Sequence, residues 1–232
     1  MKKPVIGIVS KPVKKHKDDL WHRMNIVDEL RYLVVANGGI AISLLSPEKA
    51  FEFNDNDIYD LKELTLEEIK DIDDMVKICD GIILQGGLVS CNYEIEIARK
   101  CIEYDIPLIG ICAGFNNILR ALGTDVIEDK TKKHDIYDMN YRHEIEIKKD
   151  TVLYELVGKE QLEVNSIHSM IAPIDVVKDF AQISSYTKDG LVESFELKEK
   201  KFVMGIKWHP ELMIDEKHTL NLFKKFVDEC KK

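Results

Sequence analysis

The first half of the chain alternates short apolar runs with segments of helical periodicity. The apolar runs have strand length and lie at residues 5–9, 40–45, 81–84 and 107–111. The segments between them place apolar side chains three or four positions apart, as one face of a helix requires. Strands that alternate with helices form a parallel sheet with helices on both faces. We therefore expect an α/β fold built on a doubly wound, mostly parallel sheet.

The second half follows a different pattern. After about residue 124 the apolar residues recur every second position, as Ile145 and Ile147 do. Further short strands are expected at 162–165, 181–186, 191–197 and 202–207. We expect these additional strands to be antiparallel or to lie at the sheet edge. A final amphipathic helix has an apolar face of Leu220, Phe223 and Val227.

A helix-capping motif within an acidic stretch predicts the start of one helix. Residues 48–80 hold twelve acidic residues against four lysines. Within them Thr65 and Glu68 have the spacing of a capping box. The helix that follows has an apolar face of Leu66, Ile69, Ile72 and Val76. We interpret its acids as a solvated surface rather than an acidic binding site.

Composition excludes several classes of protein. No apolar run approaches the roughly 18–20 residues of a membrane-spanning helix, so we expect neither an anchor nor a signal peptide. The net charge of -9 disfavours nucleic acid as a partner. Five cysteines without C-x-x-C spacing favour neither disulfides nor zinc, and a reducing cytoplasm suits them. No repeat or linker interrupts the chain, so we expect one domain over residues 1–232.

Cys112 is the strongest candidate for a reactive group. It lies between an apolar strand and a helix, with Gly110 two residues before it and Gly114 two residues after it. This is the spacing of a nucleophile elbow, a tight turn that exposes one side chain. The helix N-terminus favours a thiolate there. The other cysteines lack this setting, and we expect them to be small buried side chains.

A base for this nucleophile is present near the end of the chain. A plausible strand at residues 202–208 would deliver His209 and Glu211 to one side of an extended segment. Glu211 could then orient the imidazole, as the acid of a catalytic triad does. An oxyanion would need backbone donors, which Ala113 and the glycine turn at Gly87 could supply.

These segments together resemble a known family. Residues 81–87, 110–114, 165–168 and 208–211 resemble the motifs of class I glutamine amidotransferases, and within that superfamily they are most similar to the gamma-glutamyl-gamma-aminobutyrate hydrolases. Residues 189–194 resemble a further segment of that subfamily. His134 and His143 fall where the subfamily has histidines.

The resemblance implies a flavodoxin-like fold and a cysteine amidohydrolase. Cys112 would attack a gamma-glutamyl or glutamine-like amide, His209 would relay the proton and Glu211 would orient it, through a thioester and without a cofactor. The implied partner is that small-molecule substrate. A homo-oligomer and a separate synthetase chain that receives ammonia both remain open.

The sequence departs from the family on the substrate side. Asn116 stands where the family has a glutamine that helps to bind substrate, and the loop after Gly87 is short. These departures keep open a catalytically weak binding or regulatory protein. We expect Asn116 and His168 in the pocket wall, with the alternative that His168 is a core histidine bonded to a backbone carbonyl. His134 and His143, with Asp135 and Asp138, match no common ligand spacing, so no metal site is expected.

Overall fold

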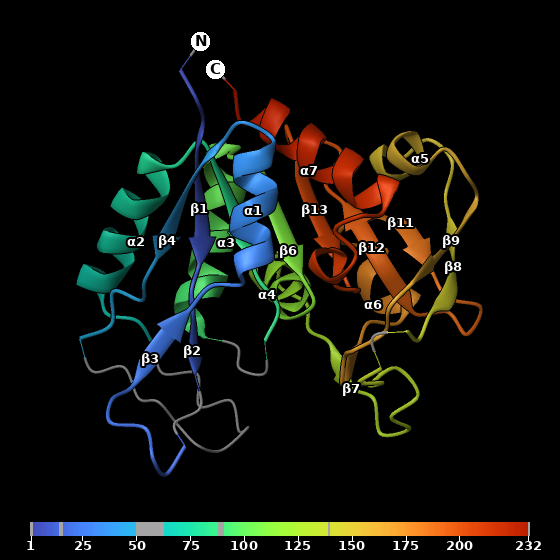
Figure 1. Ribbon diagram of the computed structural model, residues 1–232, viewed down its shortest axis with the longest axis horizontal. Coiled ribbons are helices and arrows are strands. Elements are labelled where there is room, and N and C mark those ends of the chain that lie inside the picture. The colour runs from blue at the N-terminus through green and yellow to red at the C-terminus, as the bar shows by residue number, and fades with distance from the viewer. Residues whose placement is uncertain (1, 14–15, 50–62, 88–90, 139, 232) are drawn as a thin grey trace.

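The centre of the molecule is one nine-stranded sheet (Figure 1). The structure is a computed structural model and describes residues 2–13, 16–49, 63–87, 91–138 and 140–231. The strands follow one another across the sheet in the order β4 (Ile40–Leu44), β1 (Val5–Val9), β5 (Gly81–Leu84), β6 (Leu108–Ile111), β13 (Val203–Ile206), β12 (Val192–Glu196), β11 (Gln182–Tyr186), β8 (His143–Ile147) and β9 (Gln161–Val164).

The sheet changes from parallel to antiparallel at β13. The pairs from β4 to β13 are parallel, whereas those from β13 to β9 are antiparallel. The expectation that every late strand is antiparallel or peripheral is therefore wrong for β13. Its four residues are all buried, which is typical of a central parallel strand covered on both faces. The mostly parallel α/β fold is confirmed.

In the described part of the chain, five helices of nine to thirteen residues cover the two faces of the sheet. They are α1 (Asp28–Ala36), α2 (Leu66–Ile78), α3 (Asn92–Tyr104), α4 (Ala113–Ala121) and α7 (Lys217–Glu229). One apolar core joins α2, α3 and α4 to the sheet, and a second joins α1 and α7 to the opposite face. Strand β5 shows the alternation, because Ile82 belongs to the first core and Ile83 to the second.

Two residues of the expected apolar faces lie outside the core. The capping box of Thr65 and Glu68 is present, but Leu66 is 87% exposed in the first turn of α2, and Ile72 and Val76 make the buried face. In α7, Leu220 is 45% exposed, and the helix packs through the face that contains Phe223. Residues 50–62 of the acidic stretch lie outside the described residues.

Short elements that the sequence did not predict complete the fold. They are β2 (Lys11–Val13), β3 (Arg23–Asn25), β7 (Ile127–Glu128), β10 (Met170–Ile171), α5 (Val152–Val157), α6 (Ile174–Val177) and the 3₁₀ turn η1 (Pro210–Leu212). Among the described residues, no helix combines the length and the apolar character needed to cross a membrane.

Candidate active site

Cys112 occupies a strained turn between β6 and α4. Its φ of 50° is a positive value that residues with a side chain rarely adopt. A Cβ on Gly110 would lie 2.5 Å from the carbonyl oxygen of Gly114, and one on Gly114 would lie 2.2 Å from that of Leu84. Both positions are therefore too tightly packed for any side chain. The expected strand, tight turn and helix are all present around Cys112.

Cys112 also differs from the other cysteines in its exposure and its pKa. It is partly exposed, whereas the other four are buried: Cys79, Cys91, Cys101 and Cys230. Burial raises the pKa of these thiols, that of Cys91 to about 12. Burial acts in the same direction on Cys112, but His209 beside it outweighs burial and lowers the pKa of this thiol.

His209 and Glu211 follow strand β13 and form a hydrogen-bonded pair. His209 Nδ1 lies 2.6 Å from Glu211 Oε1, and Glu211 is 3% exposed. A Cβ built on Gly86 would lie 2.5 Å from His209 Cε1 and 3.4 Å from Cys112 Cβ, so this loop faces both residues. The imidazole is hydrogen-bonded to Glu211, and it lies close enough to Cys112 for each group to shift the pKa of the other. The fold thus places the imidazole between the sulfur of Cys112 and the carboxylate of Glu211.

The charges of these three groups favour an ion pair. Burial lowers the pKa of His209, but Cys112 and Glu211 outweigh burial and raise that pKa well above its usual value. The same contact lowers the pKa of Cys112. A raised histidine pKa and a lowered cysteine pKa together favour a thiolate and an imidazolium, and the N-terminus of α4 stabilises the thiolate further.

Two amide side chains to which the sequence analysis gave no role hold the backbone near the site. Asn165 Nδ2 donates to the carbonyl oxygen of His209 at 2.8 Å, and Asn165 Oδ1 accepts the His209 backbone N–H at 2.9 Å. Gln85, directly after β5, accepts the N–H of Val27 at 2.8 Å and donates to the carbonyl of Asn25 at 2.8 Å. In the sequence, these two residues stand out through their places in the motif segments 81–87 and 165–168.

Of the two positions predicted to stabilise an oxyanion, Ala113 directly follows Cys112 in α4, and Gly87 lies in the loop after β5. Ala113 is the first residue of α4, where backbone N–H groups have no partner within the helix. Gly87 follows β5 with a φ of 151°, and a Cβ there would lie 3.3 Å from the Lys11 side chain. The oxyanion role of both residues stays a prediction.

Asn116 lies on α4 with its amide oxygen occupied. Lys207 Nζ donates to Asn116 Oδ1 at 2.6 Å and lies 4.8 Å from the centre of the Phe115 ring. Lys207 is 1% exposed, and burial lowers its pKa to about 8. The sequence analysis did not single out Lys207. Only the structure therefore reveals a buried cation beside Asn116, the residue predicted to lie in the wall of the substrate pocket.

His168 directly follows Ile167, whose carbonyl oxygen lies beside Cys112. The side chain of His168 is buried, and its Nδ1 lies 3.2 Å from the carbonyl oxygen of Met170. This is the contact of a core histidine bonded to a backbone carbonyl. Its neighbour Ile167 accepts the Cys112 thiol at 3.8 Å. A role of His168 in substrate binding stays a prediction.

The sheet order and the cysteine at a strand–helix turn define the class of protein: it is an α/β protein of the class I glutamine amidotransferase type. A family model described as Peptidase C26 matches residues 91–211, a range that includes Cys112, His209 and Glu211. The chain belongs to the Peptidase C26 family.

Several named proteins are similar to this chain over more than half of its length. A glutamine amidotransferase-like protein of Rickettsia prowazekii is 26% identical, over 99% of this chain and 98% of that protein. A subunit of the glutamine-hydrolyzing GMP synthase of Sulfurisphaera tokodaii is 25% identical, over 89% and 92%. The gamma-glutamyl-gamma-aminobutyrate hydrolase PuuD of Escherichia coli is 26% identical, over 59% of each chain.

Solved structures share the fold at lower identity. A glutamine amidotransferase from Thermotoga maritima has a TM-score of 0.60 at 15% identity and covers 100% of both chains. The glutaminase domain of Trypanosoma brucei CTPS, with bound acivicin, has a TM-score of 0.65 at 15% identity over 99% and 96%.

Proposed function

We propose that this protein is a cysteine-dependent amidohydrolase that cleaves the C–N bond of a gamma-glutamyl or glutamine-like small molecule. The observation that carries the proposal is the arrangement of Cys112, His209 and Glu211, in which the imidazole is hydrogen-bonded to Glu211 and lies beside the Cys112 thiol. The relatives named above support the substrate class, because their names include a gamma-glutamyl hydrolase and a glutamine-hydrolyzing synthase.

The proposed reaction has two steps. The Cys112 thiolate adds to the amide carbonyl carbon, and the oxyanion is stabilised by the backbone N–H groups of Ala113 and Gly87. The C–N bond then breaks as the His209 imidazolium gives its proton to the leaving amine or ammonia. A thioester remains on Cys112. Water, deprotonated by His209, attacks the thioester and releases the acid, which restores the thiolate and the imidazolium.

A single domain over residues 1–232 is part of this proposal. The central sheet takes strands from both halves of the chain, from β1 to β13. Cys112 follows β6 and His209 follows β13, which are paired in parallel. Both parts of this arrangement therefore depend on one sheet.

Covalent labelling tests the proposal directly. Incubation with a glutamine-like diazoketone, followed by intact-mass measurement, should give one adduct per chain on the wild type and none on Cys112→Ala. Cys79→Ala removes a buried thiol and serves as the matched control, so it should be labelled like the wild type. An equal adduct on Cys112→Ala would contradict the proposal, and an unlabelled wild type would favour a binding or regulatory protein.

The second candidate is a glutaminase that passes ammonia to a separate synthetase chain. The similarity to the GMP synthase component from Sulfurisphaera tokodaii over 89% of this chain favours it. This version predicts that ammonia release from glutamine appears or rises strongly when a co-purifying protein is added. Release of amines from gamma-glutamyl amides by the isolated chain would favour the first version.

A further inference from the structure

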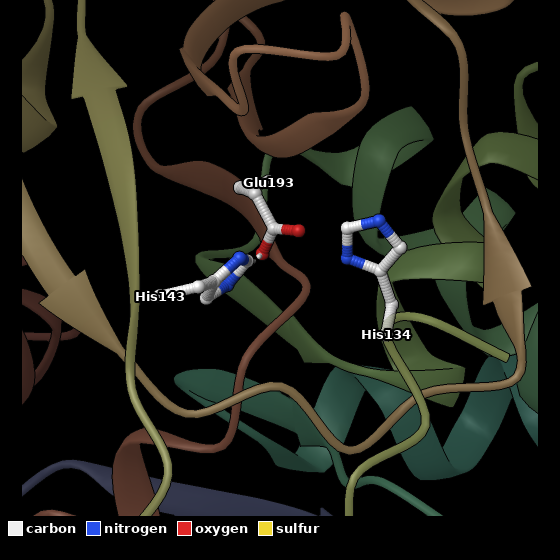
Figure 2. Close-up of side chains that lie close together, drawn as sticks. All are labelled: His134, His143 and Glu193. Atoms are coloured by element: carbon white, nitrogen blue, oxygen red, sulfur yellow. Dashed lines mark ion pairs between the residues drawn. The ribbon is translucent and has the colours of Figure 1, made fainter.

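Three side chains that are remote in sequence converge beside the antiparallel half of the sheet. His134 comes from the loop before β8, His143 begins β8 and Glu193 lies on β12. One potential ligand atom from each lies within 4.8 Å of the others. Figure 2 shows both imidazole rings beside the Glu193 carboxylate. Asp135 and Asp138, considered with the histidines from sequence, do not belong to this cluster.

Glu193 is the unexpected member of the cluster. It is completely buried, and within the described part of the chain neither carboxylate oxygen has a hydrogen-bond partner. The ring nitrogens that approach it are His168 Nε2 at 3.5 Å and His143 Nε2 at 3.9 Å, and both distances are too long for good hydrogen bonds. Burial raises its pKa to about 7. A buried carboxylate without partners is unfavourable unless it binds a cation or a proton.

No histidine among the described residues donates a hydrogen bond to this carboxylate. His143 Nε2 is buried and has no hydrogen-bond partner among the described residues. His168 Nδ1 faces the Met170 carbonyl, which can only accept, so Nδ1 carries the proton. Its Nε2 lies 3.4 Å from Ser166 Oγ and 3.5 Å from Glu193 Oε1. Burial lowers the pKa of both rings and favours the neutral imidazole, which is the form that binds metals.

His134 has the outer partner that metal-bound histidines usually have. Its Nε2 lies 3.4 Å from Asp189 Oδ2, which leaves Nδ1 for the cluster. A carboxylate on the far nitrogen of a ligand histidine orients the ring and makes it a better donor.

We propose that His134, His143 and Glu193 bind one Zn²⁺ ion, with a water molecule in the fourth position. Two imidazoles and one carboxylate are a donor set that suits zinc. Tetrahedral coordination at about 2.0–2.2 Å separates ligand atoms by roughly 3.3–3.6 Å. Closing the present spacing of up to 4.8 Å needs only small side-chain movements.

Such an ion would stabilise the backbone segments beside Cys112. The backbone N–H of His168 donates to the His134 carbonyl at 3.0 Å, and Ile167 accepts the Cys112 thiol. The loop of His134 and the segment of His168 therefore lie between the cluster and the sulfur. The ion would tie this loop to β8 and β12.

Zinc binding by chelator-treated protein tests the proposal. The measurement uses Cys112→Ala protein, because a thiolate beside an imidazole also binds zinc, and it uses competition with a chromogenic chelator for Zn²⁺. We expect one Zn²⁺ per chain, and at least about tenfold weaker binding in His143→Ala, Glu193→Gln and Asp189→Asn. His218→Ala removes a partly buried histidine on α7 and should bind like its parent. Absence of binding in the parent, or equal binding in the Glu193 and His143 variants, would overturn the proposal.

Thermal unfolding separates metal binding from folding. Zn²⁺ should raise the Tm of the parent and of His218→Ala, but not that of Glu193→Gln. A cooperative transition of Glu193→Gln without metal shows that this variant folds. An equal Zn²⁺-dependent rise in Glu193→Gln would contradict the proposal. Because the parent protein lacks Cys112, the result is independent of the proposed hydrolase activity.

Discussion

The side chain of Asn165 holds both backbone polar groups of His209, its Nδ2 on the carbonyl oxygen at 2.8 Å and its Oδ1 on the N–H at 2.9 Å. Asn165 follows β9 at one edge of the sheet, whereas His209 follows β13 in its middle. The amide thus connects the edge of the sheet to the residue that the proposed reaction uses as acid and base. It is a positioning residue, because its contacts are with the backbone of His209.

Replacement of Asn165 should therefore slow turnover more than it weakens substrate binding. Asn165→Ala removes two hydrogen bonds, and we expect a loss of about 1–3 kcal/mol in the free energy of unfolding. We also expect kcat to fall at least about tenfold with little change in KM, because the imidazole is no longer held in place. The control is Asn221→Ala on α7, which removes a side-chain hydrogen bond to the Leu156 carbonyl oxygen of α5. If both variants lose only stability, the positioning role is wrong.

The pH dependence of Cys112 alkylation should report the ion pair. Only the thiolate reacts, so the rate falls about tenfold per pH unit below the pKa of the thiol. His209 lowers that pKa, whereas burial raises it. His209→Ala should therefore raise the pKa of the thiol and move the decline to higher pH. His218→Ala should leave the profile unchanged. Iodoacetamide labelling followed by mass spectrometry measures it, and identical profiles for the wild type and His209→Ala would refute the pairing.

The buried pair of Lys11 and Glu94 should be strongly coupled. Lys11 Nζ lies 2.8 Å from Glu94 Oε1, and the two side chains are 6% and 0% exposed. Lys11→Met leaves a buried carboxylate without its cation and should cost about 3–5 kcal/mol of unfolding free energy. Adding Glu94→Gln should recover a large part of this loss.

A surface pair provides the comparison in the same denaturation experiment. Lys149 and Glu160 are 2.8 Å apart and 61% and 63% exposed, so Lys149→Met should change stability by less than about 1 kcal/mol. Additive effects of Lys11→Met and Glu94→Gln would show that the buried pair is not coupled.

Alanine at three glycines should separate an effect on activity from an effect on folding. In Gly86→Ala the new Cβ meets the His209 ring, which can rotate, so turnover should fall while most of the stability remains. In Gly114→Ala it meets the Leu84 backbone, and we expect a loss of about 1–3 kcal/mol. Gly123 has a φ of 93° and no atom within 4 Å, so Gly123→Ala should cost only the strain of about 1–2 kcal/mol. Equal kinetics for Gly86→Ala and Gly123→Ala would contradict this assignment.

Local patterns were sufficient for most of the fold. The apolar runs at residues 5–9 and 81–84 are strands, and the capping box at Thr65 begins α2, because backbone periodicity and helix capping act over a few residues. The glycines around Cys112 predicted the tight turn for the same reason. The pair at 209 and 211 was also predicted, but the extended segment expected there is wrong. Glu211 lies in the 3₁₀ turn η1 directly after His209, and the two side chains meet in that turn.

The sequence by itself determined the elements, the turn at Cys112 and the neighbouring imidazole and carboxylate of His209 and Glu211. Only the tertiary structure decided that β13 pairs in parallel with β6, which brings His209 to Cys112. It also decided that Lys207 reaches Asn116, and that Glu193 meets His134 and His143. Strand order and side-chain contacts of this kind arise when distant segments share one core, and no local pattern of residues encodes which segments will meet.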